Sequence, residues 1–373
     1  MTTAGDVVIV GGGIVGCACA YELAKAGARA TVLEYGKTGM QATNAAAGIL
    51  SPLSESAGPG PMLSFGTRAM EEYPAVVEAL EAEAGLSVEY RPIGLLRVAF
   101  DEADAAGLQR RYAWQREMGC DVAWLDRQMC LEMEPRLNAD IVAGAFWPDA
   151  VSVSNQLVVL ALARAAAARG AVIREGAPVR GFARKGSRVT AVRAGDESFA
   201  CDTVVLAAGA RSGQIAARLG ATLPVRPIRG QMIALGGMVT PVRRIIGGPA
   251  GYIVPRANGL LFAGATVEDV GFRRRTTQAG LRSMRAMAIG LVPQLRAAAV
   301  HFSWAGLRPG TPDNMPIIGP LARPANVVAA TGHFRQGIML GPLTGRLVAR
   351  GILAGDWTGV PPEFSPARFY AAS

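Results

Sequence analysis

The sequence predicts an α/β fold in which a doubly wound domain is interleaved with an α+β domain built on an antiparallel sheet. Three observations lead to this prediction. A strand, a glycine-rich turn and a helix follow one another at the start of the chain, and a second strand completes a βαβ unit. Strand and helix patterns recur between residues 150 and 215 and near the carboxyl end. Between these segments, short strands separated by turn residues are typical of an antiparallel sheet.

The βαβ unit occupies the amino-terminal segment. Asp6–Val10 predicts a short buried strand, and Ile14–Ala26 predicts a helix that ends at Gly27. Ala30–Leu33 is the next expected strand. The following stretch, Ser51 to Ser64, is rich in serine, glycine and proline, so we expect a surface loop there.

Later segments extend the same domain. An alanine-rich helix is expected over Gln156–Arg169, capped by Ser154 or Asn155 and closed by Gly170. Two further strands and a last helix are expected at Val172–Arg174, Thr203–Leu206 and Ile338–Leu353.

The second domain is expected where the hydrophobic pattern changes. Its strands are predicted at Gly94–Phe100, Gly230–Ala234, Tyr252–Pro255 and Leu260–Ala263, with helices on one side of their sheet. The predicted boundaries assign residues 1–87, 150–219 and 305–373 to the first domain, and residues 88–149 and 220–304 to the second.

Composition limits the classes of protein to consider. Of the 373 residues, half are hydrophobic and only 18% are charged, which excludes a disordered chain. The net charge of +9 raises the question of nucleic acid, but the basic residues are scattered, with Arg273–Arg275 as the longest run, so no nucleic-acid partner is predicted. The five cysteines are odd in number and unevenly spaced, so we expect reduced thiols in a cytoplasmic protein.

The start of the chain lacks the basic region of a secretory signal, so none is expected. The apolar run Val7–Ala20 is shorter than the roughly 20 residues that span a bilayer, and no transmembrane segment is predicted. Peripheral membrane contact and a homo-oligomer stay open as alternatives.

A dinucleotide site is predicted at the first turn. Gly11, Gly13 and Gly16 form a Gly-x-Gly-x-x-Gly pattern between the first strand and its helix. Gly11 allows the tight turn, Gly13 lets backbone amides approach a pyrophosphate, and Gly16 lets helix and strand pack closely. Glu34 ends the second strand, where a carboxylate can bind ribose hydroxyls and would repel the 2′-phosphate of NADP. The pattern alone also fits a flexible turn, but its context predicts a Rossmann-like domain.

The spacing does not separate FAD from NAD. The strand ending in Ala207–Gly209 and the glycine-rich Gly332–Gly345 could supply further contacts to a longer cofactor, or they could be ordinary strand-to-helix turns. On these residues alone FAD is modestly favoured.

Four segments, spread over nearly the whole chain, carry a family resemblance: Val8–Gly16 with Glu34; Ala42–Leu50; Tyr252–Arg256 followed by Gly264–Thr266; and Trp304–Asp313 with Gly332–Ile338. The first is shared by many flavin and NAD enzymes, whereas the last pair is long and specific. Through these segments the chain resembles the FAD-dependent D-amino acid oxidase family, closest to the glycine oxidases of the thiamine pathway.

The resemblance implies a set of FAD-binding residues in addition to the three glycines. It also implies that Arg308 binds the substrate carboxylate with help from Tyr252, and that Arg335 lies near substrate and flavin. Related sarcosine oxidases attach flavin through a cysteine in the carboxy-terminal third; this chain has none beyond Cys201, so noncovalent FAD is expected. The implied FAD contacts are Ile14, Val15, Glu34, Tyr35, Ala42, Thr43, Ala47, Gly48, Ile49, Val179, His333, Phe334, Arg335, Gln336, Gly337, Ile338 and Met339.

Chemistry gives each candidate a role and an alternative. The planar fork of Arg308 can pair with both oxygens of an α-carboxylate, although most arginines are simply exposed. Hydride transfer from a neutral amine to flavin needs no protein base, so His301 and His333 are expected to be structural, with His333 offering mainly backbone to FAD. Trp304 is expected to pack, and no metal-ligand cluster is visible. The amino end of the helix near Ile338 is hypothesised to face the flavin pyrimidine ring.

The resulting functional hypothesis is oxidation of a small amino acid by hydride transfer from Cα to flavin, giving a 2-oxo acid. Oxygen would accept the electrons and form hydrogen peroxide. The alternative is a dehydrogenase for D-amino acids, hydroxyproline or opines that passes electrons to a quinone or a partner subunit. Two alternative hypotheses come from other functional classes: an NAD-dependent dehydrogenase and a basic nucleic-acid-binding protein. Glycine, sarcosine, a D-amino acid or a D-proline-like imino acid all fit as substrates.

Overall fold

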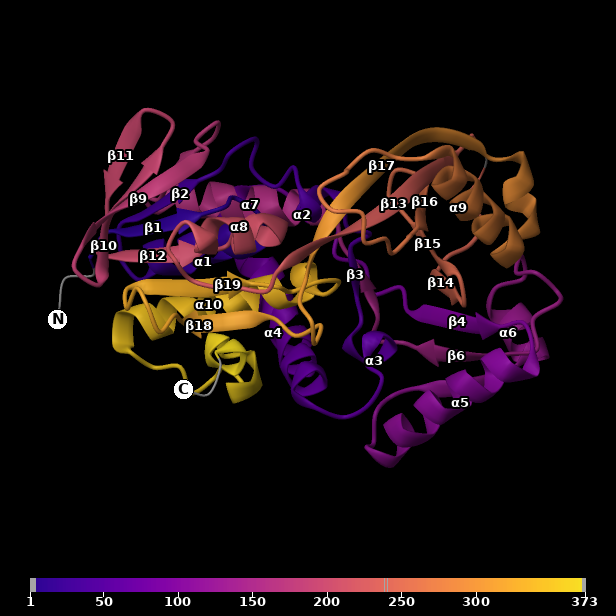
Figure 1. The fold of residues 1–373 in the computed structure, drawn as a ribbon. Helices are drawn as coiled ribbons and strands as arrows, with labels where there is room; N and C mark the ends of the chain where they lie inside the picture. The colour runs from indigo at the N-terminus through magenta and orange to yellow at the C-terminus, as the bar shows by residue number, and fades with distance from the viewer. Residues whose placement is uncertain (1–4, 238, 240, 371–373) are drawn as a thin grey trace.

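Two β-sheets organise the chain, and they lie side by side in the computed structural model (Figure 1). The structure describes residues 5–237, 239 and 241–370. One sheet has six strands and the other has eight. The predicted combination of a doubly wound parallel sheet with an antiparallel sheet is therefore confirmed.

The six-stranded sheet contains the predicted βαβ unit. Its central strands are parallel, and the edge strand β18 runs antiparallel to β19. Every residue of β1 is buried, as expected for a strand covered on both faces. In sheet order the strands are β18 (Ile317–Pro320), β19 (Val327–Thr331), β12 (Thr203–Leu206), β1 (Val7–Val10), β2 (Ala30–Leu33) and β8 (Val172–Arg174).

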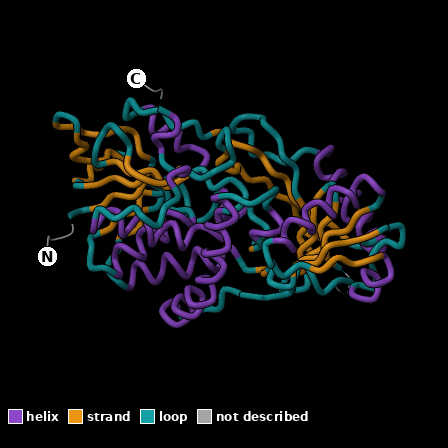
Figure 2. The backbone as a smooth tube through the Cα atoms, turned by 90° about the horizontal axis from the view of Figure 1, so that it is seen from below, coloured by secondary structure: helices purple, strands orange, loops and turns teal. Residues whose placement is uncertain are grey.

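Three helices cover one face of this sheet, where Figure 2 shows them gathered below the strands. The first, α1, packs between the other two. Where α10 crosses it, a Cβ atom at Gly345 of α10 would lie 2.5 Å from the carbonyl carbon of Ala18 in α1, so only glycine allows the two helices to approach this closely. A three-stranded sheet and helix α8 (Ser212–Ala217) cover the opposite face. The helices are α1 (Ile14–Lys25), α7 (Asn155–Ala168) and α10 (Gly337–Ala354), and the small sheet comprises β9 (Val179–Lys185), β10 (Arg188–Ala194) and β11 (Glu197–Ala200).

The eight-stranded sheet is antiparallel except for the parallel pair β14 and β4. Its two longest strands, β13 and β17, reach toward the smaller sheet (Figure 1). In sheet order the strands are β17 (Ala299–Gly310), β13 (Arg226–Gly236), β16 (Leu261–Gly264), β15 (Gly251–Pro255), β14 (Ile245–Gly248), β4 (Leu95–Ala99), β6 (Ala143–Trp147) and β5 (Ala123–Asp126).

The prediction that helices cover one side of this sheet is wrong. Helices α9 (Gln278–Leu291) and α6 (Arg127–Met133) pack on one face, whereas α5 (Glu102–Glu117) packs on the other. Gln115 of α5 is fully buried and accepts a hydrogen bond from the Trp147 indole at 2.8 Å, which fixes α5 against β6.

The surface loop predicted over Ser51–Ser64 is also wrong. Helix α3 (Pro52–Glu55) is largely buried, and helix α4 (Pro61–Ala84) begins within the same stretch. Both helices carry proline in the first turn, where the missing N–H has no helical partner and costs nothing. The prolines therefore mark helix starts at this point.

Short elements complete the chain. Strand β17 continues to Gly310, past the predicted domain boundary at residue 305, and we keep the two-domain division as a proposal.

Among the described residues no helix is long and apolar enough to cross a membrane. The remaining elements are α2 (Ala42–Ala45), β3 (Ile49–Leu50) paired with β7 (Val151–Ser152), and 3-10 helices at Gly209–Arg211, Pro293–Ala297, Pro362–Phe364 and Pro366–Phe369.

Candidate active site

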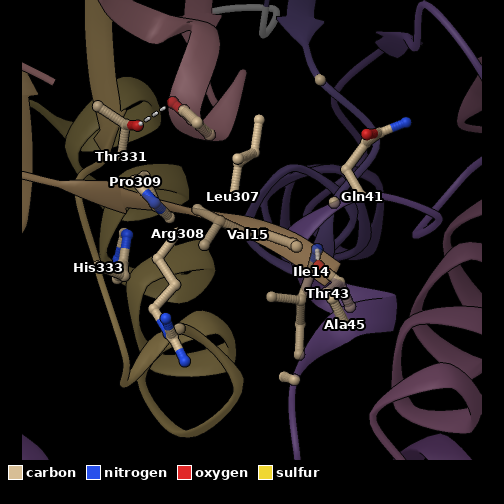
Figure 3. Close-up of a pocket in the computed structure, with 18 of the residues that line it drawn as sticks. Ile14, Val15, Gln41, Thr43, Ala45, Leu307, Arg308, Pro309, Thr331 and His333 are labelled. Carbon is tan, nitrogen blue, oxygen red and sulfur yellow. Dashed lines mark hydrogen bonds between the residues drawn. The ribbon is translucent and has the colours of Figure 1, made fainter. Parts of the chain in front are cut away.

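A cavity of about 690 Å³ extends from the six-stranded sheet to the eight-stranded sheet. It opens at the carboxyl ends of the parallel strands, where Val10, Leu33 and Thr331 line it. Figure 3 shows Ile14 and Thr43 on one side of it, and Arg308 and His333 on the other. The carboxyl edge of an open parallel sheet is where such folds bind their ligands.

The glycine-rich turn is built as the spacing predicts. Gly11 has a φ of 111°, and a Cβ there would collide with the Ala207 carbonyl, so a side chain is excluded. A Cβ at Gly16 would collide with the Gly11 carbonyl oxygen. Gly13 faces the cavity instead. On the cavity side the turn therefore presents backbone without side chains, and on its other side the helix packs closely against the strand.

Glu34 is held firmly at the end of β2. Its carboxylate is almost fully buried, and its two oxygens accept backbone N–H groups of Gly12 at 2.8 Å and Gly36 at 2.9 Å. A carboxylate has about four acceptor sites, so both oxygens retain capacity for hydroxyl donors in the cavity.

Nearly all the sequence-predicted cofactor residues are brought together along this cavity. The exception is Gly16, which does not line it and instead supports the turn from behind. The binding roles of the others stay predictions. Those lining the cavity are Gly11, Gly13, Ile14, Val15, Glu34, Tyr35, Ala42, Thr43, Ala47, Gly48, Ile49, Val179, His333, Phe334, Arg335, Gln336, Gly337, Ile338 and Met339.

The loop between β16 and α9 contributes cavity residues that the sequence analysis missed. Arg274 donates a hydrogen bond to the Gln41 side-chain oxygen at 2.6 Å. Arg211 lies between two rings, 5.1 Å from the centroid of Tyr35 and 4.9 Å from that of Phe272. The run Arg273–Arg275 was the only sequence signal for this loop, and its spacing alone does not place it at a cavity.

Arg308 and Tyr252 lie at the end of the cavity that the larger sheet forms. The Arg308 guanidinium packs over Gly230 and donates to the Thr266 carbonyl at 3.0 Å. Burial lowers the pKa of Arg308, and the neighbouring Tyr252 opposes that change. Burial raises the pKa of the Tyr252 phenol, so the hydroxyl is protonated at neutral pH and can donate a hydrogen bond.

Arg335 lines the cavity as an ion pair. Its guanidinium lies 3.0 Å from the carboxylate of Glu55, a residue of α3 that the sequence analysis did not single out. Both side chains keep solvent access, with 39% of Arg335 and 24% of Glu55 exposed. Glu55 and Glu34 are the two acidic residues among the described lining residues.

The two histidines and Trp304 occupy positions that fit structural roles. His333 is buried, its Nε2 is 2.9 Å from the Thr344 hydroxyl, and burial lowers its pKa to about 4, so the ring is neutral at pH 7. His301 is exposed on β17. Trp304 packs edge-on against Phe262 with ring centroids 4.9 Å apart.

Comparison with known proteins identifies the family. A family model described as DAO, FAD dependent oxidoreductase, matches residues 6–350. The chain belongs to this family of FAD-dependent oxidoreductases. The resemblance seen in the sequence is therefore confirmed, and FAD is the cofactor of this family member.

Relatives in the family include oxidases of small amines. A glycine oxidase of Geobacillus kaustophilus is 36% identical over 351 residues, which cover 94% of this chain and 93% of that protein. A crystal structure of glycine oxidase from this species matches with a TM-score of 0.93 and 34% identity, and the match covers 99% of this chain and 100% of that chain. An iminodiacetate oxidase from Chelativorans sp. BNC1 matches with a TM-score of 0.86 and 28% identity over 96% and 98% of the two chains. The bifunctional protein ThiO/ThiG of Synechocystis is 36% identical over 99% of this chain, which spans 55% of that protein's length.

The cavity residues fit FAD on their own geometry. The side-chain-free backbone at Gly13 suits a pyrophosphate, the anchored carboxylate of Glu34 suits ribose, and the cavity continues past both toward Arg308. Such length suits a dinucleotide whose reactive ring lies far from its adenine.

Proposed function

We propose that this FAD enzyme oxidises a small α-amino acid at the bond between Cα and nitrogen, giving an imine that hydrolyses to a 2-oxo acid and an amine. One observation carries the proposal: the part-buried guanidinium of Arg308 faces a cavity whose other end is a dinucleotide turn. FAD, when bound, supplies a two-electron acceptor.

Arg308 would hold the substrate carboxylate through two parallel N–H bonds, because its planar fork matches the two oxygens. The Tyr252 hydroxyl would add a third donor. A carboxylate fixed at this place orients the Cα–H bond of the substrate, and orientation is the main contribution required of the protein.

The lining residues named above would hold FAD noncovalently. No cysteine lines the cavity among the described residues, which supports this mode of binding. Gly337–Met339, at the start of α10, line the cavity, and we keep the prediction that this helix end faces the pyrimidine ring.

Glycine is the first substrate to test, because two relatives are a glycine oxidase and a ThiO fusion protein, and oxygen is the proposed electron acceptor. A cytoplasmic location is proposed as well, because all five thiols are free in the structure.

The test is a panel of glycine, sarcosine, D-alanine, D-proline and iminodiacetate given to the purified yellow protein. Oxygen consumption and peroxide should rise together with at least one of them. Dye reduction without peroxide would move the assignment to the dehydrogenase alternative. A protein that contains no flavin, or one whose flavin none of these amines bleaches without oxygen, would overturn the proposal.

A further inference from the structure

The substrate end of the cavity carries more positive charge than one carboxylate can balance. Four arginines interact with Glu55 there: Arg335 as its ion-pair partner, and Arg97, Arg111 and Arg308 through their charge. Of the four, Arg308 and Arg335 line the cavity itself. Their formal charges leave an excess of three positive charges. A substrate with one carboxylate on Arg308 would still leave two.

Arg97 lies on the face of the larger sheet that looks toward the site. Strand pairing places Tyr252 beside Gly247 and Gly247 beside Arg97, so Arg97 and Tyr252 share that face. Gly247 has no side chain between them, and a Cβ there would lie 3.4 Å from Arg97 Nε. The space between the phenol and the guanidinium is therefore kept clear of other side chains in this row.

Arg97 has unused hydrogen-bonding capacity. Its Nε is buried and has no hydrogen-bond partner in the described part of the chain. An unpaired buried donor on a cation is costly, because nothing compensates for the water that it has lost. Arg111 donates to the Ser54 carbonyl next to Glu55, and both Arg97 and Arg111 interact electrostatically with Glu55.

The pair of Arg335 and Glu55 is exchangeable. It lies at the cavity wall with both side chains partly in solvent, where an ion pair contributes little to stability. A carboxylate arriving on a ligand can replace Glu55 on Arg335, because Glu55 then has Arg97 and Arg111 as alternative partners. The Nε of Arg97, which has no hydrogen-bond partner in the described part of the chain, then gains one.

We propose that the preferred substrate is an amine with two carboxylates: the first binds Arg308, and the second displaces Glu55 from Arg335. This inference rests on the proposed function, since it takes the role of Arg308 from there. The second carboxylate could be attached to nitrogen or to Cα, and the two attachments share the same recognition chemistry.

Matched substrates test the proposal on the FAD-loaded enzyme. Iminodiacetate differs from sarcosine, and D-aspartate from D-alanine, by a carboxylate in place of hydrogen. We expect kcat/KM for the dicarboxylate to exceed that of its partner by about tenfold or more in at least one pair. The first pair would show attachment at nitrogen and the second attachment at Cα. Ratios below one in both pairs, with sarcosine or D-alanine oxidised, would overturn this inference alone; flavin reduction by none of the four would overturn the proposed function itself.

Variants identify the residues. Arg335→Met should lower the favoured ratio about tenfold, and Arg97→Met should lower it as well, whereas Glu55→Gln should raise it. Arg110→Met, an exposed neighbour of Arg111 on α5, is the matched control and should leave the ratio unchanged. Titration with malonate and with acetate, followed by the flavin absorbance, measures recognition without turnover, and malonate should bind more tightly. Equal effects of Arg335→Met on both members of the favoured pair, or a ratio insensitive to Glu55→Gln, would refute the assignment.

Discussion

Replacing Arg308 by alanine tests the central feature of the site. Arg308 makes no ion pair with a carboxylate in the described part of the chain; its guanidinium contacts the Thr266 carbonyl and the Tyr252 hydroxyl. Its counter-charge is therefore expected from the substrate. Removing one partner of a buried pair costs about 3–5 kcal/mol, which corresponds to a loss of roughly two to four orders of magnitude in kcat/KM.

The assay is steady-state kcat/KM for the best amino acid, measured together with flavin content and thermal stability. We expect the Arg308→Ala enzyme to keep FAD, because the dinucleotide turn lies at the far end of the cavity. Arg308→Lys should recover part of the loss, since an ammonium keeps the charge but not the fork. Arg226→Ala, on the paired strand and exposed, is the control. A kcat/KM within about threefold of the parent would refute carboxylate binding by Arg308.

The remaining predictions concern packing, cofactor binding and pH. Gly345→Ala should lower the free energy of unfolding by about 1–3 kcal/mol, because the added methyl group forces α1 and α10 apart. The control is Gly290→Ala, whose methyl group meets open space and should not lower the free energy of unfolding. Urea unfolding measures both variants, and equal stabilities would contradict the packing argument. Arg274→Met should weaken FAD binding to the apo-protein about tenfold, measured by quenching of flavin fluorescence, with Arg273→Met as its neighbour control. His333 has its pKa lowered from 6.5 to about 4 in the folded protein, so the unfolded chain binds the extra proton first and stability should fall by about 3 kcal/mol as pH drops from 6.5 to 4. His333→Gln should flatten that part of the stability curve, and an unchanged slope would show that other groups cause it.

The strands of the parallel sheet were predictable to within a residue because each is a short run dominated by aliphatic residues. Ala30–Leu33, Val172–Arg174 and Thr203–Leu206 match the observed strands. Ala30–Leu33 and Thr203–Leu206 are largely buried, so local sequence carries their signal, whereas the edge strand Val172–Arg174 is mostly exposed. Helix α5 gave no signal of this kind, because its buried residues are few and its position depends on contacts with β6.

The residues of the candidate site also differ in whether local sequence predicts them. The glycine turn and Glu34 follow from spacing, because one strand and one helix fix their geometry. The roles suggested for Arg308 and Tyr252 came from family resemblance, and spacing alone would not separate Arg308 from the other arginines. Glu55 and Arg274 escaped detection because they reach the cavity only through tertiary contacts, with Arg335 in one case and Gln41 in the other.

The cavity has a consequence for how the protein is made in the cell. Its wall begins at Val10 and ends at Met339, so a ribosome must release nearly the whole chain before FAD can find a complete binding site. A ligand that binds only the finished fold stabilises it in proportion to the logarithm of its concentration. Cells short of riboflavin would then hold more of the newly made chain in a form exposed to proteases, and the amount of enzyme would follow the supply of its cofactor.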